Sequence, residues 1–216
     1  MTGHAGPGKP VAMPTNLSAL EALDRLRAGN ARFASNVISI DSLARQLDRG
    51  ALKRNQAPIA IVLGCSDSRA PAELVFDQGL GELFVIRVAG NVVSPSQVGS
   101  VEFAAERFGC RLVVVMGHTQ CGAIDATLEA VEKGSPPASD NVMSIVERVR
   151  PAVEAAQLAG GDRETVARAA TRINVRMAVQ HLRHGTPVIE RLVTTEGMMV
   201  IGAEYDLESG RVEFIG

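Results

Sequence analysis

Two short apolar runs, each ended by a glycine and followed by metal-binding side chains, constrain the fold of this 216-residue chain most. Residues 59–63 lead to Cys65, and residues 112–116 lead to His118 and Cys121. Apolar runs of this length without polar alternation are typical of strands that are buried on both faces of a parallel sheet. Because parallel strands end at the same edge of a sheet, neighbouring strands would bring the three side chains together there.

The rest of the chain alternates between predicted helices and strands. Residues 83–88 form another apolar run, and Met198–Tyr205 and Arg211–Ile215 flank a turn and predict a hairpin. Helical periodicity predicts helices near residues 71–76, 97–108, 122–133, 141–159 and 162–184. This order predicts an α/β fold flanked by helices, whose mostly parallel central sheet has four parallel strands plus an antiparallel edge strand.

The N-terminal part of the chain predicts an arm followed by one domain. Residues 1–14 are rich in glycine and proline and predict a mobile arm, and a hydrophobic fraction of 46% is enough for residues 15–216 to form a single α/β domain. An amphipathic N-terminal helix begins near Asn16, and it either covers its own sheet or reaches across to a second subunit. Residues 41–54 predict another short helix, ended by Gly50.

Charge and composition exclude several classes of function. A net charge of −2 gives no electrostatic basis for binding nucleic acid or a membrane, and an aromatic content of 3% without tryptophan does not predict a base-stacking platform. No apolar stretch is long enough to span a bilayer, and the N-terminus lacks a signal core, so we expect a cytoplasmic protein. Three cysteines do not make a disulfide framework, and in a reducing cytosol they are more typical of buried, catalytic or metal-bound thiols.

The pair His118 and Cys121, taken alone, fits a buried thiol beside a hydrogen-bonded histidine. Cys65 follows another strand in the same way, and with it a metal site becomes the favoured interpretation, because two thiolates and an imidazole are a ligand set that suits zinc. Three protein ligands leave a fourth position for water, as in catalytic zinc sites. Cys110 begins its strand at the opposite edge of the sheet, and we interpret it as a small core residue.

Asp67, two residues after Cys65, has two possible roles at such a site. Its carboxylate either occupies the fourth zinc position and closes the site, or pairs with Arg69 and leaves the metal open. In the second arrangement Arg69 holds Asp67 ionised, and the carboxylate accepts a hydrogen bond from zinc-bound water. An ordinary surface ion pair is the alternative. Bound water that becomes hydroxide at neutral pH would attack a small, neutral electrophile, which fits the low aromatic and charge content.

The residues at both strand ends match two signatures of one enzyme family. Residues 65–69 carry C-x-D-x-R and residues 118–121 carry H-x-x-C, and residues 81–91 and 202–212 are also family-like. On these motifs the chain resembles the β-class carbonic anhydrases over about residues 17–215. The resemblance implies a carbonate dehydratase, a zinc lyase that reversibly hydrates carbon dioxide to bicarbonate and a proton.

The resemblance also implies roles for the residues of the site. It implies one Zn²⁺ ion per chain, held by Cys65, His118 and Cys121, and a zinc-bound hydroxide that the catalytic dyad of Asp67 and Arg69 orients. In a closed state, Asp67 itself would be a metal ligand. It further implies carbon dioxide and bicarbonate as the small-molecule substrates, and a homodimer or homotetramer with the substrate pocket at the dimer interface.

Three further residues match positions that bind substrate in the family. Gln56 matches a substrate-binding glutamine, Phe84 matches an aromatic side chain of the apolar pocket, and a backbone amide near Gly122 would help to hold a substrate oxygen. Two of them have a plain alternative, because Gln56 also fits a polar loop residue and Phe84 also fits strand core.

Two positions depart from the family pattern. Some members carry a regulatory bicarbonate pocket with a tryptophan and an arginine; Arg87 matches the arginine, but Val62 stands in place of the tryptophan. This favours the open, constitutively active type. Phe103 stands where some relatives have a pocket tyrosine, and it removes a hydroxyl donor.

Two other functions stay open at this point. Relatives with the same fold and zinc site hydrolyse carbonyl sulfide or carbon disulfide, and an inactive zinc-binding or inorganic-carbon-binding module would keep the three ligands. Asp67 and Arg69 count against the inactive module, because binding alone does not need the dyad.

Overall fold

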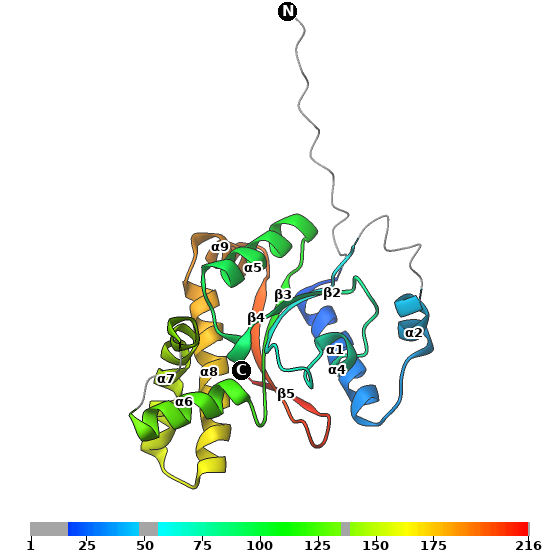
Figure 1. Cartoon of the computed structure of the whole chain (residues 1–216). Coiled ribbons are helices and arrows are strands. Elements are labelled where there is room, and N and C mark those ends of the chain that lie inside the picture. Colours follow the sequence, from blue (N-terminus) through cyan, green and yellow to red (C-terminus); the bar gives the residue numbers. More distant parts are fainter. Residues whose placement is uncertain (1–16, 48–55, 135–138, 216) are drawn as a thin grey trace, which may run out of the picture.

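The computed structural model describes residues 17–47, 56–134 and 139–215. The predicted mobile arm at 1–14 and the end of the predicted helix at 41–54 lie outside these residues. The strands are β1 (Ala60–Gly64), β2 (Leu83–Arg87), β3 (Leu112–His118), β4 (Met199–Tyr205) and β5 (Val212–Ile215). They form a five-stranded sheet in the order β2-β1-β3-β4-β5 (Figure 1). Strands β1 to β4 are parallel and β5 is antiparallel to β4, which confirms the predicted fold class.

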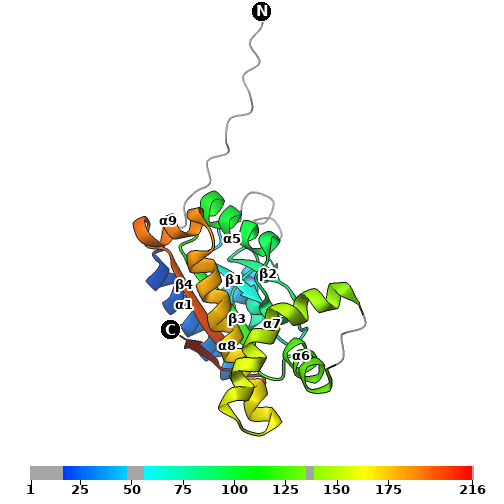
Figure 2. The same ribbon diagram turned by 90° about the vertical axis from the view of Figure 1, so that its left-hand side faces the viewer.

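Helices cover both faces of this sheet. They are α1 (Ala19–Ala34), α2 (Ile40–Leu47), α4 (Ala72–Val75), α5 (Pro95–Phe108), α6 (Gly122–Lys133), α7 (Asp140–Ala159), α8 (Arg163–His184) and α9 (Pro187–Thr195). Helices α1 and α4 lie on one side of the sheet, and α5, α8 and α9 lie on the other (Figure 1). Figure 2 shows α8 running along the strands, with α7 and α6 beside it. None of the helices in the described ranges is long and apolar enough to cross a membrane.

Strands β1 and β3 lie inside the sheet because both of their faces are apolar. Every residue of the two strands is buried. Along β3 the side chains alternate between two cores, with Val113 and Val115 packed on the α8 side and Val114 on the α1 side. Burial of one such side chain contributes about 1.5–3 kcal/mol. The register pairs Gly64 with Met116, so the residues that follow β1 lie beside the end of β3.

The N-terminal helix α1 covers its own sheet, which is the first of its two expected arrangements. It begins with a capping box in which Ser18 Oγ accepts the backbone N–H of Glu21, and the Glu21 carboxylate accepts the backbone N–H of Ser18. Leu23 and Leu26 are buried against the strands. The buried Asn30 amide donates to the carbonyl of Val75, the last residue of α4, and to the carbonyl of Gly210 before β5, and its oxygen accepts the first N–H of β5. These bonds fix α1 to the sheet.

Helix α9 is not among the elements expected from the sequence. The sequence pattern predicts a helix at 162–184 and no further element before residue 198, whereas Pro187 begins a new helix shortly after the end of α8. Thr186 is the N-cap, and its Oγ1 accepts the backbone N–H of Ile189 at 3.2 Å. A proline fits the first turn of a helix as well as the segment after one, so this stretch favours either interpretation.

Candidate metal centre

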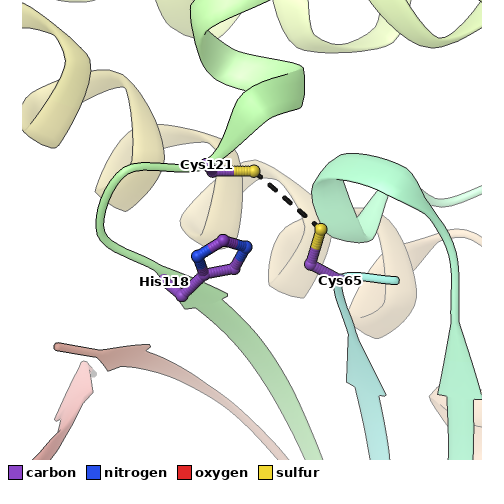
Figure 3. Close-up of side chains that lie close together, drawn as sticks. All are labelled: Cys65, His118 and Cys121. Carbon is purple, nitrogen blue, oxygen red and sulfur yellow. Dashed lines mark hydrogen bonds between the residues drawn. The ribbon is translucent and has the colours of Figure 1, made fainter. Parts of the chain in front are cut away.

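Three potential metal ligands meet at the carboxyl edge of the sheet. Cys65 follows β1 directly, His118 is the last residue of β3, and Cys121 precedes the first residue of α6 (Figure 3). All three side chains are buried, and their ligand atoms lie within 4.8 Å of one another. Such a group could hold a metal ion. The adjacency of β1 and β3 is therefore what brings together residues that are more than fifty positions apart in the chain.

The two sulfur atoms face each other. Cys65 Sγ and Cys121 Sγ are 3.9 Å apart, and Cys65 Sγ also accepts the backbone N–H groups of Asp67 and Gly90, each at 3.4 Å. The hydrogen bond with Cys121 is the largest of several that lower the pKa of Cys65 to about 4, against the opposing effect of burial. The same hydrogen bond and burial raise the pKa of Cys121. The contact thus favours one thiolate beside one thiol, and a cation bound between the two sulfurs would displace the remaining proton.

His118 presents one ring nitrogen to the two sulfurs. Its Nδ1 lies 2.8 Å from the carbonyl oxygen of Thr119, to which it donates, so Nε2 carries the lone pair in the neutral ring. Nε2 is buried and has no hydrogen-bond partner among the described residues. Burial lowers the pKa of His118, but the nearby Cys65 thiolate and the Thr119 carbonyl outweigh it and raise the pKa. A buried nitrogen without a partner, aimed at two thiols, fits a metal ligand.

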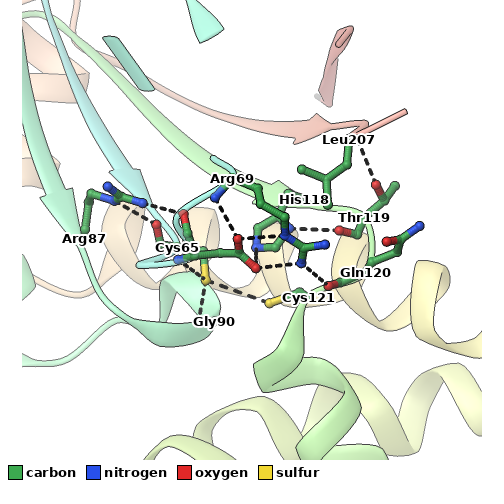
Figure 4. Close-up of polar contacts among 10 residues, drawn as sticks. Cys65, Arg69, Arg87, Gly90, His118, Thr119, Gln120, Cys121 and Leu207 are labelled. Carbon is green, nitrogen blue, oxygen red and sulfur yellow. Dashed lines mark hydrogen bonds and ion pairs between the residues drawn. The ribbon is translucent and has the colours of Figure 1, made fainter. Parts of the chain in front are cut away.

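Asp67 pairs with Arg69 in this structure. Arg69 Nε donates to Asp67 Oδ1 at 3.0 Å and Arg69 Nη2 donates to Oδ2 at 2.8 Å (Figure 4). The backbone N–H of Arg69 also donates to Oδ1, at 2.9 Å. These hydrogen bonds, those of the side chain first, hold the pKa of Asp67 well below its usual range. Asp67 Oδ2 lies 3.9 Å from His118 Nε2, so the ionised carboxylate borders the three ligand atoms.

Two residues outside the predicted ligand set support this loop. Arg87, the last residue of β2, donates from Nε to the Cys65 carbonyl at 3.0 Å and from Nη2 to the Asp67 carbonyl at 2.5 Å (Figure 4). Gly90 supplies an N–H to Cys65, as described above. The rule that identified β1 and β3 applies equally to β2, whose carboxyl end lies beside that of β1. Extending it to β2 would have predicted that these residues lie at the site.

The remaining predicted site residues lie in different places. Gly122 begins α6 next to Cys121 and is exposed, so its N–H lies at the edge of the centre. Gln56 is exposed and precedes the opposite end of β1. Phe84 lies in the middle of β2, half-buried, with its ring 6.2 Å from that of Phe103 and packed against α5. The structure thus brings Gly122 together with the three potential metal ligands and the Asp67–Arg69 pair, but not Gln56 or Phe84.

Comparisons with known proteins agree with this geometry. A sequence model of the carbonic anhydrase family matches residues 60–212. A carbonic anhydrase of Mycolicibacterium smegmatis is 38% identical over 198 residues, which are 92% of this chain and 94% of that protein. A tetrameric β-carbonic anhydrase of Sordaria macrospora has a TM-score of 0.71 at 22% identity, over 88% of this chain and 94% of that one. A β-carbonic anhydrase of Aspergillus fumigatus also reaches 0.71, at 25% identity, over 89% of this chain and 90% of that one.

These matches confirm the resemblance that the two strand-end motifs indicate. The sequence match extends far beyond the motifs, and the folds agree over nearly the whole chain. The chain belongs to the β class of the carbonic anhydrase family.

Proposed function

We propose that this chain catalyses the reversible hydration of carbon dioxide to bicarbonate and a proton. The observation that carries the proposal is the buried Cys65, His118 and Cys121 set bordered by an ionised Asp67 that Arg69 holds in place. Relatives of similar length carry the name carbonic anhydrase, which supports the same activity here.

We assign one Zn²⁺ ion per chain to Cys65 Sγ, His118 Nε2 and Cys121 Sγ. The fit rests on the two facing sulfurs and on the buried His118 nitrogen that has no partner in the described residues. When bound, zinc would lower the pKa of a water molecule, so that hydroxide is available near neutral pH.

Asp67 and Arg69 form the catalytic dyad of the proposed reaction. A guanidinium group stays protonated at all relevant pH, so Arg69 cannot act as a base, and its role is to keep Asp67 ionised and turned toward itself. Asp67 Oδ2, at the border of the three ligand atoms, accepts a hydrogen bond from the attacking oxygen and orients it toward carbon dioxide. A closed state with Asp67 as a fourth ligand would first require the loss of both hydrogen bonds from the Arg69 guanidinium.

The N-terminus of α6 is the proposed position of the substrate oxygens. The N–H of Gly122 lies at the positive end of a twelve-residue helix, next to Cys121. An N–H at this place can donate to the oxygen on which negative charge develops as bicarbonate forms.

We also propose a homodimer formed along β2, or a homotetramer of two such dimers. Gln56 lies at the far end of β1 from its own metal centre, so it would contribute to a site only from a second copy. Strand β2 is an edge of the sheet, and the apolar side chains of Leu80, Phe84 and Phe103 on and beside it, here called the β2-edge surface, include two that are about half exposed. The Sordaria macrospora relative is tetrameric, which supports assembly of this chain.

Zinc analysis together with a carbon dioxide hydration assay tests the proposal. We expect one zinc per chain and catalysed hydration, with loss of zinc in Cys65→Ser. Cys110→Ser is the matched control, because Cys110 is buried elsewhere in the core and its thiol donates to the Pro58 carbonyl. Fast turnover of carbonyl sulfide or carbon disulfide with negligible carbon dioxide hydration would overturn the substrate assignment. Bound zinc without turnover of any of these substrates would indicate a binding module.

A further inference from the structure

A buried asparagine of α8, Asn174, contacts the turn that supplies a hydrogen bond to Cys65. Asn174 Nδ2 donates to the carbonyl oxygen of Gly90 at 2.9 Å. The N–H of Gly90 in turn donates to Cys65 Sγ at 3.4 Å (Figure 4). We propose that Asn174 is a positioning residue for the Cys65 ligand and acts on it through Gly90. The inference rests on the proposed metal-binding role of Cys65.

The backbone at Gly90 is unusual in a way that makes an external support important. Gly90 has φ of 67° and is followed by Asn91 with φ of 44°, so two consecutive residues of the 3₁₀ turn η1 (Ala89–Asn91) are left-handed. Non-glycine residues such as Asn91 adopt this conformation rarely, and it persists where surrounding contacts hold it. A bond from the adjacent Gly90 carbonyl to α8 is such a contact.

Packed elements surround this turn, which contacts α6 and α7 as well as strands β1 and β3. A Cβ atom on Gly90 would lie 3.0 Å from Ala123 Cβ and 3.3 Å from Val149 Cγ2, so α6 and α7 press on the turn at that point. On another side, Val92 and Asn174 line a cleft of about 560 Å³ between α5, α7 and α8. Asn174 therefore reaches the Gly90 carbonyl from the wall of this cleft, and its hydrogen bond adds to the packed side chains that hold the turn.

The environment of Asn174 indicates that its amide is there for this bond. Most of its neighbours on the buried face of α8 are apolar, among them Ala170, Val175 and Ala178. Asn174 itself is buried, and a buried polar side chain on such a face is unfavourable unless it is hydrogen-bonded. Its Nδ2 makes that bond across 84 residues of sequence, to the residue whose N–H donates to Cys65 Sγ.

The backbone of Gly90 links the hydrogen bond from Asn174 to the position of the Cys65 sulfur. The N–H group toward Cys65 and the carbonyl toward Asn174 lie on the two sides of the same residue, so a shift of the carbonyl also moves the N–H. A hydrogen bond to a thiolate fixes the position of the sulfur atom and withdraws negative charge from it. Both effects determine how strongly the sulfur binds a metal ion. Loss of the Asn174 donor would therefore loosen Cys65 without removing any ligand.

The test compares metal binding by two Asn174 variants and one matched control. Asn174→Leu fills the same volume without a donor, and Asn174→Ala removes both. Thr171→Val is the control, because Thr171 is buried one turn earlier on α8 and its hydroxyl bonds only the Ala167 carbonyl of its own helix. Zinc affinity is measured by competition with a chromophoric chelator. The thiolate-to-metal absorption is recorded after loading with Co²⁺, and the stability of the zinc-free protein is measured by urea unfolding.

We expect both Asn174 variants to bind zinc about 10–100-fold more weakly than wild type and to shift the cobalt–thiolate absorption, as changes next to metal ligands do. Thr171→Val should stay within about twofold of wild type in affinity and keep the wild-type spectrum. If the Asn174 variants lose stability but retain wild-type affinity and spectrum, the role of Asn174 is structural and the inference is wrong. If wild type binds neither metal, the proposed metal centre itself fails, which is a separate outcome.

Discussion

Both carboxylate oxygens of Asp67 accept hydrogen bonds from the guanidinium group of Arg69, at 3.0 and 2.8 Å. The two residues are only two positions apart, and the same loop carries Cys65 at its start. Arg69 Nη2 also donates to the Gln120 carbonyl at 3.1 Å, so the pair is tied to the loop that supplies Cys121. The carboxylate is therefore oriented by the protein itself, before any substrate binds.

Replacing Asp67 should abolish most of the proposed activity while leaving metal binding in place. We expect Asp67→Ala to lower kcat/KM for carbon dioxide hydration by about 100-fold or more, because the attacking oxygen loses its orientation. Stopped-flow measurement of hydration, with zinc content measured on the same sample, checks this result. Asp24→Ala is the matched control, since Asp24 forms an exposed ion pair with Arg27 on α1. Wild-type kcat/KM in a fully zinc-loaded Asp67→Ala enzyme would contradict the dyad mechanism.

The meeting of the two strand ends was predictable because it follows from the parallel arrangement of the strands in the sheet. Two apolar runs imply neighbouring parallel strands, and their carboxyl ends then bring Cys65 and His118 together wherever the intervening helices lie. The pairing of Asp67 with Arg69 was one of two arrangements that the sequence left open. The choice depends on side-chain geometry within a single loop, which residue spacing does not determine.

Contacts made across long sequence separations were not predictable from local pattern. The bond of Asn174 to Gly90 spans 84 residues and arises from the way α8 packs across the sheet. The sequence pattern of the helix does not distinguish Asn174 from its other polar residues. The helix α9 was missed for a different reason, because Thr186 and Pro187 are equally typical of a helix end and of a helix start.

The ion pair of Asp67 should make the stability of the zinc-free protein depend on pH in acid. Arg69 lowers the folded-state pKa of Asp67, so the stabilisation is fully present above the unfolded pKa of about 3.9 and is lost as the pH falls toward the folded value. We expect the difference in free energy of unfolding between wild type and Asp67→Asn to be constant above about pH 5 and to shrink below about pH 4.

Urea unfolding at several pH values, in the presence of a chelator, measures this difference. In an Arg69→Gln background the pH-dependent part of the Asp67→Asn effect should be much smaller, because the guanidinium hydrogen bonds, the largest cause of the lowered pKa of Asp67, are gone. An equal dependence on pH in both backgrounds would show that Arg69 is not its cause.

A charge on the β2-edge surface should break the proposed oligomer. Phe103 is 55% exposed and packs against Phe84 and Phe108, so a second copy on β2 would bury it. We expect Phe103→Glu to raise the dissociation constant of the dimer by about 10-fold or more, as measured by sedimentation at several concentrations. Leu158→Glu is the control, because Leu158 is 90% exposed on α7 at a distance from β2. Unchanged assembly of Phe103→Glu would place the interface elsewhere.

Gly64, the last residue of β1, and Gly117, which precedes His118 in β3, look equivalent in the sequence but have different surroundings. A Cβ atom on Gly64 would lie 3.8 Å from Met116 Cε, an ordinary contact, whereas one on Gly117 would lie 2.7 Å from Val175 Cγ2 and 3.1 Å from Thr171 Cγ2. β3 and α8 thus approach each other closely at Gly117, beside His118. Overpacking of this kind typically costs about 1–3 kcal/mol.

We therefore expect Gly117→Ala to lower the free energy of unfolding of the zinc-free protein by about 1–3 kcal/mol, and Gly64→Ala to change it by less than about 1 kcal/mol. Urea unfolding measures both variants under the same conditions. Because α8 and the end of β3 must separate to admit the new methyl group, Gly117→Ala should also weaken zinc binding by displacing His118. Equal losses in the two variants would show that both glycines serve the same conformational purpose, and that the close approach of α8 at Gly117 is not what requires glycine there.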